Sequence, residues 1–145
     1  LNPCSYPNLA KLIRHHSSQY REDGHQLFKR LLANILLGNT DDHARNHALV
    51  YWVASASWRL SPAYDMLPTV GSNNSKQAMG VGKAGADSTV ENALGYAGLF
   101  GLDQSAARQM ADQCLEAFRH WPACCEAARM AAGDQAIVGN TLRLR

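Results

Sequence analysis

The sequence predicts a mostly α-helical α+β fold that contains one β-hairpin at about residues 47–60. Apolar residues recur with helical spacing on both sides of this segment, whereas the segment itself is rich in β-branched and aromatic residues. The chain has 145 residues and is 46% hydrophobic, a size and composition typical of one globular domain. We therefore expect residues 1–145 to form a single domain.

Two helices are predicted before the hairpin. Residues 7–16 carry apolar residues at helical spacing, with Pro7 near the first turn. Residues 22–37 have a broader apolar face, which is typical of a central core helix and consists of Leu27, Leu31, Leu32, Ile35 and Leu36. Gly38 follows at the position where a glycine with left-handed backbone ends many helices.

The hairpin is predicted from two short runs on either side of a small-residue turn. Residues 47–53 have the composition of a strand, and residues 58–61 form a returning strand that ends before Pro62. Trp52 and Trp58 flank the turn, and we expect both to pack in the core or within the hairpin.

A long loop and a further helix are predicted after the hairpin. Residues 71–87 are rich in Gly, Ser and Asn, with a short strand expected at 77–81. Ser88 and Glu91 match a capping box, in which the serine accepts from the amide at the third helical position and the glutamate reaches back. This cap should begin a helix that extends to about residue 100.

The last third of the sequence predicts two more helices. Asp103 or Ser105 can cap the first of them, which has small and apolar residues at helical spacing. Pro122 should interrupt that helix because proline lacks an amide hydrogen. A final helix over 123–132 should then end at Gly133.

Composition argues against several classes of function. The net charge is only +2 and the basic residues are scattered, which gives no argument for direct binding to nucleic acid. No apolar run approaches the roughly 18 residues of a membrane helix, and no signal peptide is recognised, so we expect a cytoplasmic protein without membrane contact. The cysteines form no C-x-x-C pair, which favours reduced thiols over a zinc site. Because the chain begins with Leu1 rather than Met, we interpret it as part of a longer protein.

Ionisable side chains are concentrated between the predicted core helix and the hairpin. Asp41 and Asn46 have the spacing D-x-x-x-x-N, which protein kinases use for the catalytic base and a Mg²⁺ ligand. Asp65 follows the hairpin and could supply a second oxygen ligand, the kind that Mg²⁺ prefers. The spacing alone is weak evidence, but the order of helix, loop, hairpin and aspartate is more specific.

These residues resemble the C-terminal lobe of the HipA-like serine/threonine kinases, the toxin kinases of bacterial toxin–antitoxin pairs. The resemblance is carried by a loop with Gly, Asp, His, Arg and Asn, followed by a Ser-Pro-x-Tyr-Asp segment. In this sequence the matching residues are Gly38, Asp41, His43, Arg45, Asn46, Ser61, Pro62, Tyr64 and Asp65. Similarity at residues 6–16, 27–39 and 85–94 extends the resemblance over nearly the whole chain.

The resemblance implies an ATP-dependent protein kinase that uses Mg²⁺. Asp41 would be the catalytic base, Asn46 and Asp65 would be the Mg²⁺ ligands, and His43 and Arg45 would lie near the nucleotide phosphates or the phosphorylated hydroxyl. The resemblance also implies a protein substrate in the translation machinery, such as an aminoacyl-tRNA synthetase. It implies a HipB-like helix-turn-helix antitoxin as partner, through which any contact with DNA would be indirect.

Two alternatives remain open. Residues 1–37 contain neither a Gly-rich loop before a strand nor a lysine-bearing strand, which the N-terminal lobe of a kinase supplies. We therefore expect that lobe to be absent from this chain, so that the isolated lobe is nearly inactive or acts as an inert protein-binding module. The other alternative is a metal-dependent hydrolase that uses Asp41, Asp42, His43 and His47, although a strand beginning at His47 would remove the helical spacing of the two histidines.

Overall fold

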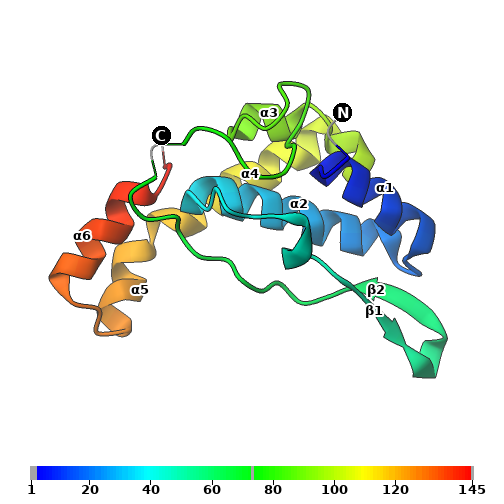
Figure 1. Ribbon diagram of the computed structural model, residues 1–145, viewed down its shortest axis with the longest axis horizontal. Coiled ribbons are helices and arrows are strands. Elements are labelled where there is room, and N and C mark those ends of the chain that lie inside the picture. Colours follow the sequence, from blue (N-terminus) through cyan, green and yellow to red (C-terminus); the bar gives the residue numbers. More distant parts are fainter. Residues whose placement is uncertain (1–2, 73, 145) are drawn as a thin grey trace.

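The computed structural model of the protein describes residues 3–72 and 74–144. Within these residues the fold is mostly helical α+β, with six α-helices and a two-stranded antiparallel sheet, as the sequence predicts. The long helix α2 (Tyr20–Leu37) runs through the centre of the molecule (Figure 1). The hairpin projects beyond one end of this helix, and α5 and α6 lie at the other end (Figure 1).

The two predicted N-terminal helices are confirmed. Helix α1 (Tyr6–His16) begins at Ser5, whose hydroxyl accepts from the backbone of the first turn. Helix α2 buries its apolar face in the core, where the Phe28 and Phe100 ring centroids are 5.1 Å apart. It ends at Gly38, which has a φ of 71°. A side chain on Gly38 would also collide with the backbone of Thr141, since a Cβ there would lie 2.2 Å from the carbonyl oxygen.

The predicted hairpin is also confirmed, with shorter strands than expected. Strand β1 (Leu49–Trp52) pairs antiparallel with β2 (Ser57–Leu60), and a 3₁₀ turn connects them. The ring centroids of Trp58 and Tyr51 are 5.1 Å apart, so Trp58 packs within the hairpin as expected. Trp52, in contrast, is 57% exposed, so the expectation that it packs in the core or hairpin is wrong. The hairpin projects too far from α2 to bury both of its faces.

The long connection from 61 to 89 follows α2 away from the hairpin and then returns to α3 (Figure 1). The strand predicted at 77–81 is wrong, because the described part of this segment forms only isolated bridges. Met79 and Val81 are indeed buried, which explains the apolar pattern. Their neighbour Gly80 pairs with the start of α1, where its carbonyl accepts from Tyr6 N at 2.9 Å. Pairing at Gly80 alone thus accompanies the burial of Met79 and Val81, although the segment does not form a strand.

The capping box predicted at Ser88 is displaced by one residue. Thr89 caps α3 (Val90–Leu94), accepting from Asn92 N at 3.2 Å. The Ser88 hydroxyl instead accepts from the Gln77 side-chain amide at 2.9 Å. The helix expected to reach residue 100 is also interrupted, since a 3₁₀ helix over Ala97–Phe100 follows α3.

The C-terminal region contains one more helix than predicted. Asp103 caps α4 (Gln104–Arg119), accepting from Ala106 N at 2.8 Å, as expected. Helix α5 (Trp121–Ala127) carries Pro122 in its first turn. It stops before Arg129, which has a left-handed φ of 54°. The expected end at Gly133 is therefore wrong, because this glycine lies in the first turn of α6 (Ala132–Thr141).

The chain after α6 folds back onto the end of α2. Arg143 N donates to the Leu36 carbonyl at 2.8 Å, and the Arg143 guanidinium donates to the Asn74 carbonyl at 2.6 Å. Among the described residues, none of the helices is both long enough and apolar enough to cross a membrane.

Candidate active site

The loop between Gly38 and β1 holds the predicted catalytic residues in irregular backbone. A single 3₁₀ turn, Ala44–Asn46, is its only regular element among the described residues. Asp41 is exposed to solvent, whereas its neighbour Asp42 is 2% exposed. Asn46 is also buried, at 6% exposure. The two adjacent aspartates therefore have different environments and different partners.

Asp42 lies in a buried cluster with a tyrosine and a histidine. The Tyr6 hydroxyl, from α1, donates to Asp42 Oδ2. His47 Nε2 lies 3.2 Å from the same carboxylate oxygen, and the Tyr6 and His47 rings meet edge to face at 5.3 Å. Burial and the neighbouring Asp42 carboxylate raise the pKa of Tyr6 well above its usual value. Its hydroxyl consequently stays protonated and remains a hydrogen-bond donor.

The cluster continues through two buried asparagines to the predicted site. Asn34, on α2, donates from Nδ2 to the Tyr6 hydroxyl oxygen at 3.0 Å. Asn39 Nδ2 in turn donates to Asn34 Oδ1 at 3.0 Å and to the Asp65 carbonyl at 3.5 Å. Asn39 Oδ1 accepts from Asp41 N at 3.3 Å. One asparagine side chain thus contacts the backbone of both Asp41 and Asp65.

A second contact joins the loop to the segment after the hairpin. The Tyr64 hydroxyl donates to the Arg45 carbonyl at 2.8 Å. The next residue, Asp65, has a left-handed φ of 57°, which is uncommon for a residue with a side chain. Such backbone is tolerated by aspartate and often occurs at functional sites. These contacts bring the backbones on both sides of the hairpin together at Arg45 and Asp65.

Asn46 and Asp65 offer oxygen atoms that suit a hard cation. The Asn46 side-chain amide makes no hydrogen bond to another described residue although the residue is buried, so its oxygen is not committed to a partner. Asp65 is exposed and offers a carboxylate. Mg²⁺ is commonly held by one or two such side chains together with substrate phosphates and water. The donor set therefore fits Mg²⁺ with a nucleotide, and the roles of these residues remain predictions.

The two other predicted site residues have less defined surroundings. His43 is half-buried, and its Nδ1 is buried without a hydrogen-bond partner in the described structure. Arg45 is exposed and makes no ion pair with another described residue. Both belong to the same loop as Asp41 and Asn46, but among the described residues no hydrogen bond or ion pair joins their side chains to Asp41 or Asp65.

The structure adds positioning residues that the sequence analysis missed. Tyr6, Asn34, Asn39 and Asp42 are all buried and form the hydrogen-bonded chain beneath the loop. Tyr6 and Asp42 are 36 positions apart, and no local pattern marks such a contact. Only the unusual polarity of the loop gave a signal, which could not distinguish a buried aspartate from an exposed one.

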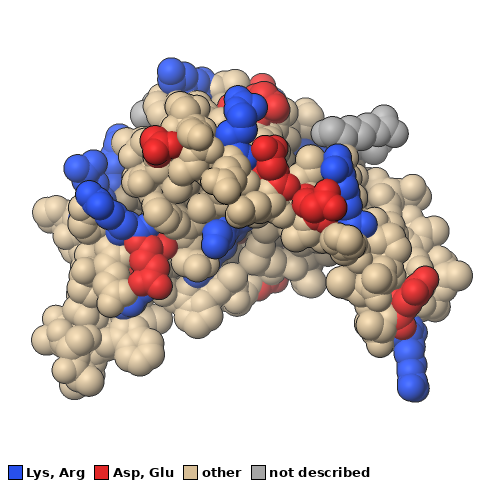
Figure 2. Space-filling view, turned by 180° about the vertical axis from the view of Figure 1, so that it is seen from behind, with Lys and Arg blue, Asp and Glu red and all other residues tan. Residues whose placement is uncertain are grey.

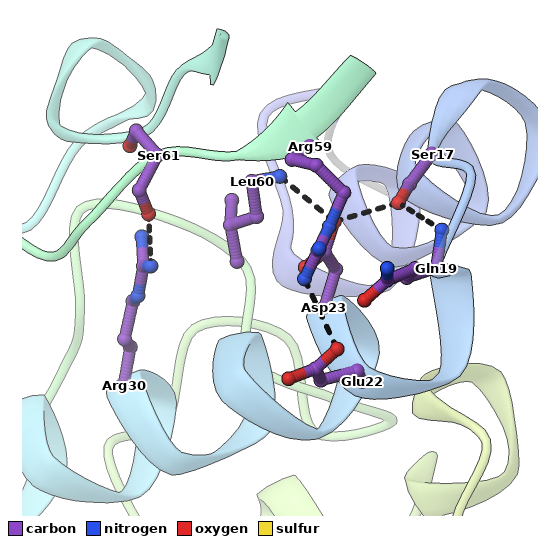
Figure 3. A network of polar contacts seen from close by, with 8 residues as sticks. All are labelled: Ser17, Gln19, Glu22, Asp23, Arg30, Arg59, Leu60 and Ser61. Atoms are coloured by element: carbon purple, nitrogen blue, oxygen red, sulfur yellow. Dashed lines mark hydrogen bonds and ion pairs between the residues drawn. The ribbon is translucent and has the colours of Figure 1, made fainter. Parts of the chain in front are cut away.

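A second polar cluster, also missed, joins α2 to the hairpin (Figure 3). Asp23 accepts from Arg59 Nη2 at 2.8 Å, from Ser17 Oγ at 2.6 Å and from Leu60 N at 2.8 Å. Burial raises the pKa of Asp23, but the hydrogen bonds from Arg59, Ser17 and Leu60 N together lower it by more. The pKa of Asp23 therefore lies below its usual value. This ionised carboxylate joins the hairpin to α2 and to the end of α1.

The described residues contain no group of three or more His, Cys, Asp or Glu that could hold a metal ion. His47 and Asp42 are instead paired with each other beneath the loop. None of the four cysteines forms a disulfide within the described structure, in agreement with reduced thiols. This arrangement gives no support to the hydrolase alternative.

Comparison with known proteins identifies the family. Residues 2–121 match the family described as "HipA-like C-terminal domain". The chain is also 33% identical over 63 residues to a Haemophilus influenzae protein named "Putative kinase", a match that covers 43% of this chain. The matched region spans only 18% of that relative's length. The loop after Gly38, the hairpin and Asp65 all lie within the range matched by the family, and the chain belongs to the family of HipA-like C-terminal domains.

Proposed function

We propose that this chain is the C-terminal catalytic lobe of a protein serine/threonine kinase. The observation that carries the proposal is the contact of Asn39 with both Asp41 N and the Asp65 carbonyl. This contact links the backbone of the predicted base to that of a predicted metal ligand, although the two residues lie on opposite sides of the hairpin. Membership in the HipA-like family supports the same conclusion.

In the proposed reaction Asp41 accepts the proton of a serine or threonine hydroxyl on a protein substrate. Asn46 and Asp65 hold Mg²⁺, which when bound neutralises charge on the ATP phosphates. His43 and Arg45 lie beside the phosphates and add positive charge or hydrogen bonds. Catalysis of this kind depends mainly on positioning and on electrostatic stabilisation of the transferred group.

The proposal requires a second lobe to complete the ATP site. A phosphate-covering loop and a lysine that contacts the nucleotide are needed, and the described residues 3–37 contain α1 and all of α2 without either. We propose that these parts are supplied outside residues 1–145, with the enzyme acting as the cytoplasmic toxin of a toxin–antitoxin pair. Its substrate would then belong to the translation machinery, for example an aminoacyl-tRNA synthetase, and its partner would be a HipB-like antitoxin.

The decisive experiment follows phosphoryl transfer by the full-length protein that contains this lobe. With ATP and Mg²⁺, Asp41→Ala and Asp65→Ala should each lower the rate of autophosphorylation by about 10²-fold or more. Asp112→Ala, which removes an exposed carboxylate on α4, is the matched control and should leave the rate unchanged.

Two results would refute the kinase proposal for this chain. One is unchanged transfer in both Asp41→Ala and Asp65→Ala. The other is a genomic context in which neither the same reading frame nor a neighbouring gene encodes a lobe with the missing loop and lysine. In that case the inert protein-binding module is the better function, and the exposed aromatic residues of the hairpin favour it.

A further inference from the structure

A groove separate from the proposed active site lies between α2 and the hairpin. Its volume is about 490 Å³, within the range of about 300–1,000 Å³ that is usual for binding pockets. Lys29 and Arg30 line it on the α2 side, and Trp52, Pro62 and Met66 line it on the other side. Asp41, Asn46 and Asp65 are not among the residues that line it.

Arg30 is a buried cation in this groove without an anionic partner. The residue is 9% exposed, and among the described residues its only hydrogen bond goes from Nη2 to the Ser61 carbonyl. Its other terminal nitrogen, Nη1, is buried with no hydrogen-bond partner. Figure 3 shows the Arg30 side chain rising from α2 apart from the Asp23 cluster and reaching Ser61 alone.

Arg59 provides the contrast within the same groove. Its guanidinium is paired with both Asp23 and Glu22, at 2.8 and 3.2 Å. Asp23 is therefore already occupied by Arg59, by Ser17 and by Leu60 N, and it makes no ion pair with Arg30. Among the described residues, the groove therefore pairs one guanidinium with carboxylates and gives the other no ion pair.

Burying a charge without an ion-pair partner costs free energy. We therefore infer that an anion pairs with Arg30 in the functional state. Burial lowers the pKa of Arg30 by more than its neighbours Tyr6, Asp23, Tyr64 and Asp42 raise it. Arginine nevertheless remains charged in proteins. Lys29 is exposed beside it and makes no ion pair with another described residue. The groove thus presents two cations without a carboxylate of their own.

The apolar surface around the groove indicates what kind of molecule would carry the anion. Trp52 is 57% exposed at the groove, and the adjoining hairpin exposes further apolar side chains, namely Val50, Tyr51, Val53 and Trp58. In Figure 2, where the hairpin projects at the lower left, its tip carries no charged side chain. Aromatic residues with few charges are typical of the centre of protein interfaces. A small anion would leave this apolar surface uncovered.

We propose that the groove between α2 and the hairpin binds a protein segment that carries an acidic side chain next to apolar ones. The carboxylate pairs with Arg30 and Lys29, and the apolar neighbours pack on Trp52 and Met66. Hydrogen bonds between a guanidinium and a carboxylate are charge-assisted and stronger than those between neutral groups. The site lies outside the proposed catalytic residues, so the proposal stands whether or not the lobe transfers phosphate.

The test is an NMR titration of the ¹⁵N-labelled chain with two blocked peptides, acetyl-Phe-Glu-Leu-amide and acetyl-Phe-Gln-Leu-amide. The glutamate peptide should produce saturable shifts of the Trp52 indole N–H and the Arg30 Nε–H signals. The glutamine peptide should bind about fivefold or more weakly, because it lacks the charged acceptor. Sodium phosphate at matched ionic strength should not shift the Trp52 signal.

Variants make the test specific to this groove. Arg30→Gln should abolish the preference for glutamate over glutamine. If that variant does not fold, Lys29→Gln decides the outcome, because this residue is exposed and its loss should weaken glutamate binding by about two- to fivefold. Arg119→Gln, on the exposed side of α4, is the control and should bind as the wild type does.

Three outcomes would overturn the proposal. They are equal affinity for the two peptides, unchanged affinity in Lys29→Gln, and a Trp52 shift with phosphate equal to that with the peptide. The last outcome would identify a pocket for small anions instead. Each differs from a failure of the kinase proposal, which is measured on Asp41 and Asp65.

Discussion

Single residues decide how the loop between Gly38 and β1 is held. Asp41 and Asp42 are adjacent and identical in type, yet one is exposed and the other is buried against Tyr6 and His47. The exposed carboxylate is free to meet a substrate, whereas the buried one ties the loop to α1. Asn39 then relates the loop to Asp65 through its two side-chain hydrogen-bond groups.

We predict that Tyr6→Phe destabilises the protein by about 1–3 kcal/mol, because it leaves the buried Asp42 carboxylate without its tyrosine donor. The free energy of unfolding in urea measures this loss. Tyr20→Phe is the matched control, since Tyr20 is 41% exposed and its hydroxyl makes no hydrogen bond to a described residue. Equal stability of Tyr6→Phe and Tyr20→Phe would contradict the role given to the buried cluster.

At the scale of elements, Asp23 joins the hairpin to α2, beside the packing of Leu49 and Leu60 on the core. Its aromatic residues are largely exposed, while Asp23 accepts from both Arg59 and Leu60 N at the end of β2. Ser17 adds a third bond from the end of α1. One ionised carboxylate therefore contributes to holding the hairpin, together with the backbone bond from Ser18 N to the Trp58 carbonyl at 3.2 Å.

The stability of this connection should depend on pH in the acid range. Because the folded pKa of Asp23 is lowered, its contribution is complete above the unfolded pKa, near 4, and is lost as the pH falls through the folded pKa. Asp23→Asn should cost about 1–3 kcal/mol at pH 7 and give a flatter curve of unfolding free energy below pH about 4.

The matched control for this prediction is Asp112→Asn, an exposed aspartate on α4. Its acid limb should follow that of the wild type. Parallel acid limbs for the wild type and Asp23→Asn would show that Asp23 does not link the hairpin to α2.

The described part of the molecule is a group of packed helices that carries the predicted catalytic loop and a projecting hairpin. The core of α1, α2, α3 and α4 positions the loop, and the chain after α6 returns to the end of α2. The groove beside Arg30 and the exposed hairpin are surfaces that the described residues do not cover. This arrangement suits a lobe that works against other protein surfaces.

The isolated chain should bind Mg²⁺–ATP only weakly, because the proposal leaves half of the nucleotide site to another lobe. At 5 mM Mg²⁺–ATP, a dissociation constant near 1 mM would stabilise the chain by about 1 kcal/mol and raise Tm by about 4 °C or less. Thermal unfolding followed by circular dichroism provides the measurement. Asp65→Ala should remove the shift, and a shift that corresponds to micromolar affinity would show that residues 1–145 already form a complete site.

The sequence by itself determined the order of elements and the location of the polar loop. Periodicity, the glycine at position 38, the Asp103 cap and the β-branched run are local signals, so the two N-terminal helices, α4 and the hairpin could be predicted. Local signals failed where one contact competed with them. Ser88 bonds Gln77 and leaves the cap to Thr89, and the apolar run near Val81 pairs only at isolated bridges.

Only the tertiary structure decided which polar groups are buried and what they touch. Tyr6 reaches Asp42 across 36 positions, and Arg59 reaches Asp23 across the same separation. Arg30 has the same side chain as Arg59 but makes no ion pair with a described carboxylate, and its hydrogen bond goes to the Ser61 carbonyl. The physical reason is that burial and charge pairing arise from segments that meet only after the chain has folded, whereas helix and turn preferences act between near neighbours.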